Sequence, residues 1–203
     1  NGLDLKAIDI FAGHSLGEYS ALCASGVMSL RDTSIILRKR GLAMQEAVLE
    51  GQGSMVAVLG MTNESVSELM VISKCDSQLI QVANDNDPSQ VVVSGEKQEV
   101  QNFIAFLKEK KSKRTIDLPV SAPFHSPLMK HAALAMEAEL KKVKVSSPIV
   151  PIIQNVDLSV LKSTNGLVDR LVQQICGTVR WRESLQKMVD AFGVSAFFEI
   201  GPG

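Results

Sequence analysis

The sequence has few aromatic residues and no marked excess of either charge. Aromatic residues make up only 4% of the 203 residues, so we expect a core built mainly from aliphatic side chains. The formal net charge is −1, which argues against nucleic acid as a partner, because neutralising phosphates requires a basic surface. Hydrophobic residues make up 45% of the chain, so a sizeable core can form in one compact domain that carries an inserted subdomain.

The sequence is also poor in cysteine. Cys23, Cys75 and Cys176 lie far apart, and no C-x-x-C pair or Cys/His group has the spacing of metal ligands. We therefore predict neither a disulfide framework nor a metal site. The chain lacks a run of about 18 apolar residues that could span a membrane, and it lacks a recognisable signal peptide. These absences favour a cytoplasmic location without a membrane partner.

Neither end of the sequence has the features of a natural terminus. The chain starts with Asn1 instead of Met, and it stops at Gly203 directly after an apolar stretch. We therefore expect a truncated or processed chain.

A short motif near the start of the sequence indicates a serine nucleophile. Residues 13–17 read GHSLG, a G-x-S-x-G pattern with Ser15 at its centre. An apolar, β-branched stretch precedes the motif, and helix formers follow it. In such a strand–turn–helix context, small residues let the serine project from a tight turn, and the helix N-terminus can stabilise an oxyanion. The alternative is an ordinary glycine-rich turn with an unreactive serine.

The rest of the chain alternates between strand-like and helix-like patterns. Residues 53–119 have the order β-α-β-β-α-β of a ferredoxin-like unit, with a turn predicted at residues 84–89. Around this insertion, residues 1–52 and 120–203 predict a larger α/β unit with a mainly parallel sheet. We expect strands at 7–12, 55–59, 79–83, 90–94, 114–118, 150–155 and 196–200, and helices at 18–25, 32–49, 63–74, 97–110, 131–143, 167–175 and 181–190.

A serine nucleophile needs a base, and three histidines are available. His14 adjoins Ser15, but neighbours on a sharp turn point apart, so we expect His14 to line the pocket. His131 lies early in a helix and is typical of the surface. His125 lies in a loop that Pro123 and Pro127 stiffen, which favours it as the base over a purely structural histidine. Either a backbone carbonyl or the amide of Gln174 could orient it.

Arg40 lies in an otherwise apolar stripe of its predicted helix. Ile36, Arg40, Met44 and Ala47 fall on one face at helical spacing. Burying an arginine is costly unless it has an anionic partner. Periodicity leaves two alternatives open, a structural role and a ligand-binding role.

The sequence resembles a family of enzymes, the malonyl-CoA:acyl carrier protein transacylases and the related acyltransferase domains of fatty acid and polyketide synthases. The likeness begins at the GHSLG motif and extends over essentially the whole chain in the family's order. The further matching segments are 39–47, 53–55, 84–92, 119–129, 155–157 and 199–203.

The resemblance implies an α/β-hydrolase-like fold and a role for each candidate residue. Ser15 would be the acyl nucleophile, His125 the base, and Gln174 would lie where the family orients its catalytic histidine. Arg40 would bind the free carboxylate of the malonyl group, as a bidentate pair. The implied pocket comprises Leu16, as an oxyanion donor through its backbone N–H, and His14, Met44, Phe124, Asn84 and Asn86.

The implied reaction transfers a malonyl group from malonyl-CoA to acyl carrier protein through a malonyl-serine, without a cofactor or a metal. We expect a monomer. The most serious departure from the family is at the start, because residues 1–9 do not match the strand and the Gln-bearing loop that supply a second oxyanion donor. Loss of such a donor typically costs about 100- to 1,000-fold in rate. The alternatives are an α/β-type serine hydrolase or thioesterase, a polyketide synthase acyltransferase domain, and a non-catalytic module that binds carrier protein.

Overall fold

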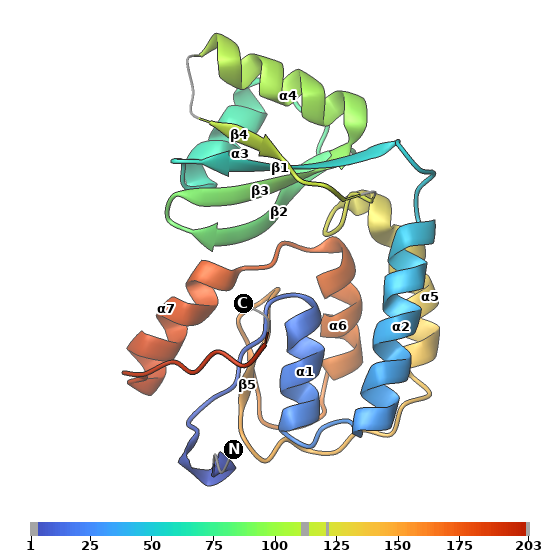
Figure 1. Cartoon of the computed structure of the whole chain (residues 1–203), viewed down its shortest axis with the longest axis vertical. Helices are drawn as coiled ribbons and strands as arrows, with labels where there is room; N and C mark the ends of the chain where they lie inside the picture. The colour runs from blue at the N-terminus through green and yellow to red at the C-terminus, as the bar shows by residue number, and fades with distance from the viewer. Residues whose placement is uncertain (1–3, 111–113, 121, 202–203) are drawn as a thin grey trace.

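The computed structural model describes residues 4–110, 114–120 and 122–201 and has a mixed α/β architecture. A four-stranded sheet with its helices occupies one end of the molecule, and a group of helices occupies the other (Figure 1). Within the described residues, no helix is long and apolar enough to cross a bilayer.

The larger sheet is antiparallel, with the strand order β2-β3-β1-β4. Helix α3 connects β1 to β2, and helix α4 connects β3 to β4, so the elements follow the predicted β-α-β-β-α-β order. The bounds are β1 (Gly53–Leu59), α3 (Asn63–Ile72), β2 (Ile80–Asp87), β3 (Gln90–Glu96), α4 (Lys97–Glu109) and β4 (Thr115–Asp117). The division of the chain at residues 53 and 119 stays a prediction.

Alternating side chains of β1 build a core on each face of this sheet. Val56 and Val58 point to the face that α3 and α4 cover. Met55 and Ala57 point to the opposite face and form a small cluster against Phe124. Because successive strand residues face opposite sides, one apolar strand can serve both cores.

Helices α1 (Leu16–Ala24), α2 (Leu30–Glu46), α5 (Lys130–Leu140) and α6 (Leu167–Cys176) form the other main core. Fully buried side chains from these helices include Leu22, Ile36, Met136 and Leu171. The 3₁₀ turns η1 (Leu5–Ala7) and η2 (Pro127–Met129) precede α1 and α5, and α7 (Trp181–Phe192) lies beside β2 (Figure 1).

The helix starts follow from hydrogen-bonding side chains. The Oγ of Ser29 accepts a hydrogen bond from the Asp32 N–H at 3.0 Å, so α2 begins at Leu30, before its predicted start at residue 32. Asp32 occupies the third helical position, where its carboxylate accepts from the Ser29 hydroxyl. Thr62 caps α3, because its Oγ1 accepts from the Ser65 N–H at 3.2 Å.

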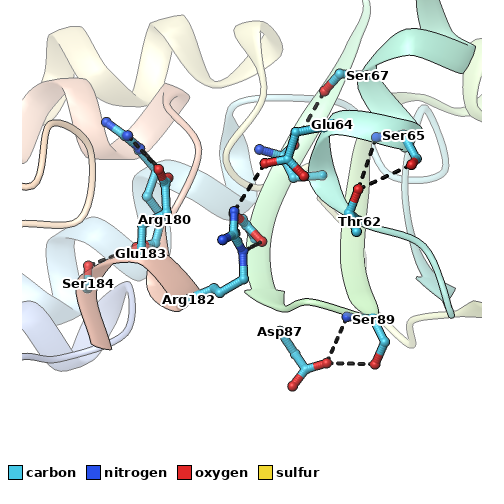
Figure 2. A network of polar contacts seen from close by, with 12 residues as sticks. Thr62, Glu64, Ser65, Ser67, Asp87, Ser89, Arg180, Arg182, Glu183 and Ser184 are labelled. Atoms are coloured by element: carbon cyan, nitrogen blue, oxygen red, sulfur yellow. Dashed lines mark hydrogen bonds and ion pairs between the residues drawn. The ribbon is translucent and has the colours of Figure 1, made fainter. Parts of the chain in front are cut away.

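Ion pairs join α7 to the sheet and to α3 (Figure 2). The guanidinium of Arg182 donates to both carboxylate oxygens of the buried Asp85 on β2, with Nη2 2.8 Å from Oδ2 and Nε 3.0 Å from Oδ1. The same Nη2 lies 3.3 Å from the carboxylate of Glu64 on α3. This two-pronged contact fixes the sheet against the helical part of the molecule.

Two predicted strands are wrong. Residues 7–12 begin at the last residue of η1 and contain a single parallel bridge from Phe11 to Ile152, and residues 196–200 have no strand structure. Phe198 is 71% exposed and Ile200 is 82% exposed, so these apolar side chains leave most of their surface unpacked by the described residues. A strand depends on a neighbour for its hydrogen bonds, and periodicity alone does not supply one.

The predicted mainly parallel sheet is also absent from the described residues. Strands β5 (Ile152–Ile153) and β6 (Val160–Leu161) pair antiparallel, and parallel pairing is limited to isolated bridges. The predicted turn at 84–89 is too long as well. Strand β2 continues to Asp87, because the Asp85 N–H donates to the carbonyl of Val179 and β3 pairs on its other side.

Candidate active site

Ser15 occupies a sharp turn directly before α1. Its φ of 50° and ψ of −104° place it in a region that residues with a Cβ rarely adopt. Gly13 makes the turn possible, because a Cβ there would lie 2.0 Å from the backbone carbonyl of Gly17. Leu16 opens the helix, and the first N–H groups of a helix have no acceptor within it. The N–H groups of Gly17 and Glu18 donate to the carbonyls of His14 and Ser15, so the turn places the hydroxyl beside the N–H of Leu16 as the available donor.

The structure places His125 directly against this hydroxyl. The Oγ of Ser15 and the Nε2 of His125 are 2.7 Å apart. The Nδ1 of His125 lies 2.7 Å from the backbone carbonyl of Gln174, which can hold the ring with Nδ1–H as donor and Nε2 as acceptor. Of the two orienting groups that the sequence left open, the backbone carbonyl contacts the ring.

The loop that carries His125 is fixed by a side chain from the sheet. The backbone of His125 has a φ of 56°, another left-handed value for a residue with a Cβ. The amide of Gln81 donates to the carbonyls of His125 and Cys176 at 2.7 and 2.6 Å. These bonds attach the strained loop to β2 and to the end of α6.

His125 is neutral over a wide pH range. Burial, with the positive charge of Arg40 as a second cause, lowers the pKa of His125 to about 3. The imidazole is thus unprotonated near neutral pH, the form that accepts a proton from Ser15.

Arg40 projects from α2 into the same site. Its side chain is buried, with 5% exposure, and the Nη2 donates to Ser15 Oγ and to Gln174 Oε1, both at 3.1 Å. The Cζ lies 5.5 Å from the ring centre of Tyr19, which covers one side of the guanidinium. The Nε of Arg40 is buried and has no hydrogen-bond partner among the described residues. A buried guanidinium with a free donor beside a nucleophile is suited to bind an anion.

Two amide side chains hold the backbone of Ser15. The Oδ1 of Asn155 accepts from the Ser15 N–H at 2.8 Å, and its Nδ2 donates to the Gly13 carbonyl at 2.9 Å. The Nε2 of Gln174 donates to the Ser15 carbonyl at 2.9 Å. Both amides are fully buried. The strained turn is therefore held from both sides of its central residue.

Glu18 lies beneath these amides, one helical turn after Ser15. Its carboxylate is 1% exposed and accepts hydrogen bonds from Gln174 and Asn155. Burial raises the pKa of Glu18 to about 7, against the opposing effects of these hydrogen bonds and of the Arg40 charge.

The predicted pocket residues differ in how close they lie to the nucleophile. The Nε2 of His14 is 2.8 Å from Asn86 Oδ1, and its ring meets that of Trp181 edge-on at 5.5 Å. Burial lowers the pKa of His14. Asn84 is buried on β2, where its backbone bridges to Val179 on the approach to α7.

The apolar residues of the predicted pocket differ in how deeply they are buried. Leu16 is 51% exposed at the start of α1, and Phe124 is half-buried between two core clusters next to the base. Met44 lies fully inside the helical core that also contains Tyr19. Its role in shaping an acyl pocket stays a prediction.

The sequence predicted no role for Glu18, Asn155 or Gln81. For Glu18 a signal was present, because it is the single charged residue in the otherwise apolar helix α1. Asn155 occurs in a segment that carries the family resemblance, without a function attached to it. For Gln81, a polar residue in an apolar strand, no comparable signal distinguishes it from a surface position.

The arrangement combines a half-buried serine nucleophile, a neutral base and a buried cation. Ser15 Oγ contacts both His125 Nε2 and Arg40 Nη2, so an acyl group on the serine would lie beside a guanidinium. Within the described residues, no group of three or more His, Cys, Asp or Glu side chains could hold a metal ion. The chemistry that these groups support is acyl transfer through a serine ester, with selection for an anionic acyl group.

Comparison with known proteins agrees with this chemistry. Residues 6–202 match the family model described as an acyl transferase domain. The malonyl CoA-acyl carrier protein transacylase of Bacillus subtilis is 43% identical over 195 residues, which cover 96% of this chain and 61% of the relative.

Two solved structures are similar over nearly the whole chain. An acyl-carrier-protein S-malonyltransferase from Bartonella henselae is 48% identical, with a TM-score of 0.92, over 100% of this chain and 64% of its own. A malonyl-transacylase solved in complex with a type II PKS acyl-carrier protein is 38% identical, with a TM-score of 0.91, over 97% of this chain and 63% of its own. The chain thus spans less than two thirds of the length of these relatives.

Proposed function

Because this chain belongs to the acyl transferase domain family, we propose that it transfers a malonyl group from malonyl-CoA to the phosphopantetheine thiol of acyl carrier protein. The observation that carries the proposal is the position of Arg40, whose buried Nη2 lies 3.1 Å from the Ser15 hydroxyl. A guanidinium in this place gives a dicarboxylic acyl group a partner for its free carboxylate.

The first half of the reaction forms the acyl-enzyme. His125 Nε2 accepts the hydroxyl proton as Ser15 Oγ attacks the thioester carbonyl of malonyl-CoA. The new C–O bond forms, the C–S bond breaks, and the departing CoA sulfur takes the proton from His125. The Leu16 N–H, at the start of α1, donates to the oxyanion.

The second half runs the same steps with the carrier thiol. His125 accepts the thiol proton, the sulfur attacks the malonyl-serine ester, and the C–O bond to Ser15 breaks. The proton returns from His125 to Ser15 Oγ, so the enzyme is regenerated. Ser15, His125 and Arg40 supply the nucleophile, the base and the charge partner, and we propose that no metal or cofactor takes part.

Arg40 selects the acyl group by its charge. A malonyl carboxylate pairs with the guanidinium, whereas an acetyl group leaves that charge buried without a partner. The relatives named malonyl transacylases support this choice of substrate, and the neighbour solved with an acyl-carrier protein supports the choice of acceptor.

The proposal extends to how the chain is divided into units, to its oligomeric state and to its location. We infer an α/β-hydrolase-like unit from residues 1–52 and 120–203 that carries a ferredoxin-like insertion at 53–119. Ser15, His125 and Arg40 all come from one chain, so a monomer suffices. A reducing, cytoplasmic setting is consistent with the free thiols of Cys23, Cys75 and Cys176.

Intact mass spectrometry after mixing the protein with malonyl-CoA tests the proposal. We expect a mass increase of one malonyl group in the wild-type chain and none in Ser15→Ala. An adduct that persists in Ser15→Ala would overturn the assignment of the nucleophile. Free malonate without any transfer to a thiol acceptor would favour a serine hydrolase, and no adduct at all would favour a non-catalytic module that binds carrier protein.

A further inference from the structure

The carboxylate of Glu18 is the shared acceptor beneath the nucleophile turn. Its Oε2 accepts from Gln174 Nε2 at 2.7 Å and from the Asn155 N–H at 3.2 Å. Its Oε1 accepts from Gln154 Nε2 at 3.4 Å. These three partners of the carboxylate are all donors, and Glu18 is 1% exposed.

The residues that Glu18 holds are those that hold Ser15. Asn155 Oδ1 accepts from the Ser15 N–H, and Gln174 Nε2 donates to the Ser15 carbonyl. Gln174 also accepts from Arg40 through Oε1, and its backbone carbonyl orients His125. The carboxylate of Glu18 is therefore connected, through Gln174 and Asn155, to the nucleophile, the base and the buried cation.

We propose that Glu18 is a positioning residue, whose ionised carboxylate fixes the amides of Gln174 and Asn155 and thereby holds the strained Ser15 turn in its reactive conformation. The inference rests on the proposed function only in taking Ser15 as the nucleophile. It does not depend on which acyl group the serine receives. Partners that orient the groups of a site typically affect activity by about 10- to 100-fold.

The charge of Glu18 matters because its neighbours only donate. A glutamine at this position would keep the shape but would present an NH₂ group to N–H donors, leaving at least one buried donor without an acceptor. An aspartate would keep the charge but withdraw it by one methylene group. These two variants separate the chemistry of the acceptor from its reach.

The surroundings of Glu18 also predict how the effect depends on pH. The charged or titratable groups that face Glu18 are Arg40 from α2 and Tyr19, the next residue of α1. The other contacts of Glu18 are neutral amides and a backbone N–H. Because its pKa is about 7, Glu18 becomes protonated as the pH falls below 7, and it then loses its charge and gives up part of its acceptor capacity to an O–H donor. His125, with a pKa of about 3, contributes no change in this range.

The test measures the rate at which Ser15 is acylated in single-turnover experiments with two reagents. Malonyl-CoA reports the proposed reaction, and a fluorophosphonate reports nucleophilicity alone, since Ser15 Oγ displaces fluoride from phosphorus without using the malonyl carboxylate. We expect Glu18→Gln to slow both reactions by about 10- to 100-fold. The wild-type rate should rise with pH through about 7, and this rise should be absent in Glu18→Gln.

Glu46→Gln is the matched control, because Glu46 is an exposed residue at the end of α2. Circular dichroism and the melting temperature show that each variant is folded. Where Glu18→Gln does not fold, Glu18→Asp decides, with a smaller loss that still exceeds the control. Acylation rates within twofold of the control in the folded variants, with an unchanged pH profile, would overturn the proposal.

The two reagents distinguish this inference from the proposed function. A wild-type chain that reacts with the fluorophosphonate but not with malonyl-CoA contradicts the malonyl transfer and leaves the role of Glu18 measurable. A chain that accepts malonyl at the same rate with and without Glu18 supports the transfer and contradicts the role of Glu18.

Discussion

Arg40 is the residue whose replacement separates recognition of the acyl charge from the chemistry at Ser15. We predict that Arg40→Ala lowers the acylation rate from malonyl-CoA relative to acetyl-CoA by about 10- to 100-fold. This factor corresponds to roughly 1.5–3 kcal/mol for a hydrogen bond to a charged group. The measurement is the ratio of kcat/KM for the two substrates.

Arg38→Ala is the control for this prediction, since Arg38 lies exposed on the same helix. An equal loss with both acyl groups in Arg40→Ala would mean that Arg40 only supports the structure around Ser15 and Gln174.

The two glycines that flank Ser15 form a second test at the residue scale. Gly13→Ala places a Cβ 2.0 Å from the Gly17 backbone, so we predict a loss of about 1–3 kcal/mol in stability and slower acylation of Ser15. Gly17→Ala meets no atom within 4 Å in a helical position, so it should be neutral or stabilise by up to about 1 kcal/mol. Melting temperatures and adduct formation measure both effects. Equal behaviour of the two variants would contradict this description of the turn.

Single residues also show how far the sequence could predict the site. Ser15 and its turn follow from local spacing, and the place of Arg40 on the buried face of its helix follows from helical periodicity, since both signals lie within a few positions. Periodicity left the role of Arg40 open. Glu18 and Gln174 meet across 156 positions of sequence, and Glu18 and Asn155 across 137. No local pattern encodes a hydrogen bond over such a separation, so the network beneath Ser15 emerges only from the structure.

At the scale of elements, the contact between β2 and α7 holds the sheet against the helices. Arg182 on α7 donates to both oxygens of Asp85, which is fully buried on β2. The next residue on β2, Asn86, contacts His14 beside the nucleophile. The ion pair thus lies close in sequence to a residue that borders the site.

We predict that Asp85→Asn lowers the free energy of unfolding by about 1.5–3 kcal/mol, because the charge-assisted bonds to Arg182 are lost. Urea titrations of the variant and of Asp117→Asn, an exposed site on β4, measure the difference. A loss no larger than that of the control would show that the ion pair adds nothing to the connection between α7 and the sheet.

The elements were predictable to the extent that their signals are local. The strands and helices of residues 53–119 appear in the expected order, because alternation and helix caps act over a few residues. The stretch at 196–200 has the composition of a strand but no partner among the described residues. Strand β2 extends beyond its predicted end at residue 83. Backbone hydrogen bonds with Val179 support this extension on the side of β2 opposite β3.

At the scale of the whole molecule, two buried groups of the site act oppositely on acid stability. His125 has a pKa of about 3 when folded and an ordinary value of 6.5, so the unfolded chain binds the extra proton between these values and stability falls as the pH drops. Glu18 has a pKa of about 7 when folded and an ordinary value of 4.5, so the folded chain binds the extra proton and stability rises as the pH drops.

These opposite effects predict how two variants change the response to acid between pH 6.5 and 4.5. The melting temperature of Glu18→Gln should fall more steeply than that of the wild type, because the contribution of His125 is no longer offset. The melting temperature of His125→Asn should fall less steeply. Differential scanning calorimetry at several pH values measures both slopes. Parallel slopes for all three proteins would contradict the assignment of these two pKa values.

In the reaction that we propose, Ser15 accepts a malonyl group and passes it to a carrier thiol. The most direct measurement follows the masses of both proteins after malonyl-CoA is mixed with this chain, excess reagent is removed and carrier protein with its phosphopantetheine arm is added. We predict that a malonyl group first appears on the wild-type chain, then leaves it and appears on the carrier protein in equal amount, with neither step in Ser15→Ala. A malonyl group that leaves the chain as free malonate, or never binds Ser15, would contradict the account.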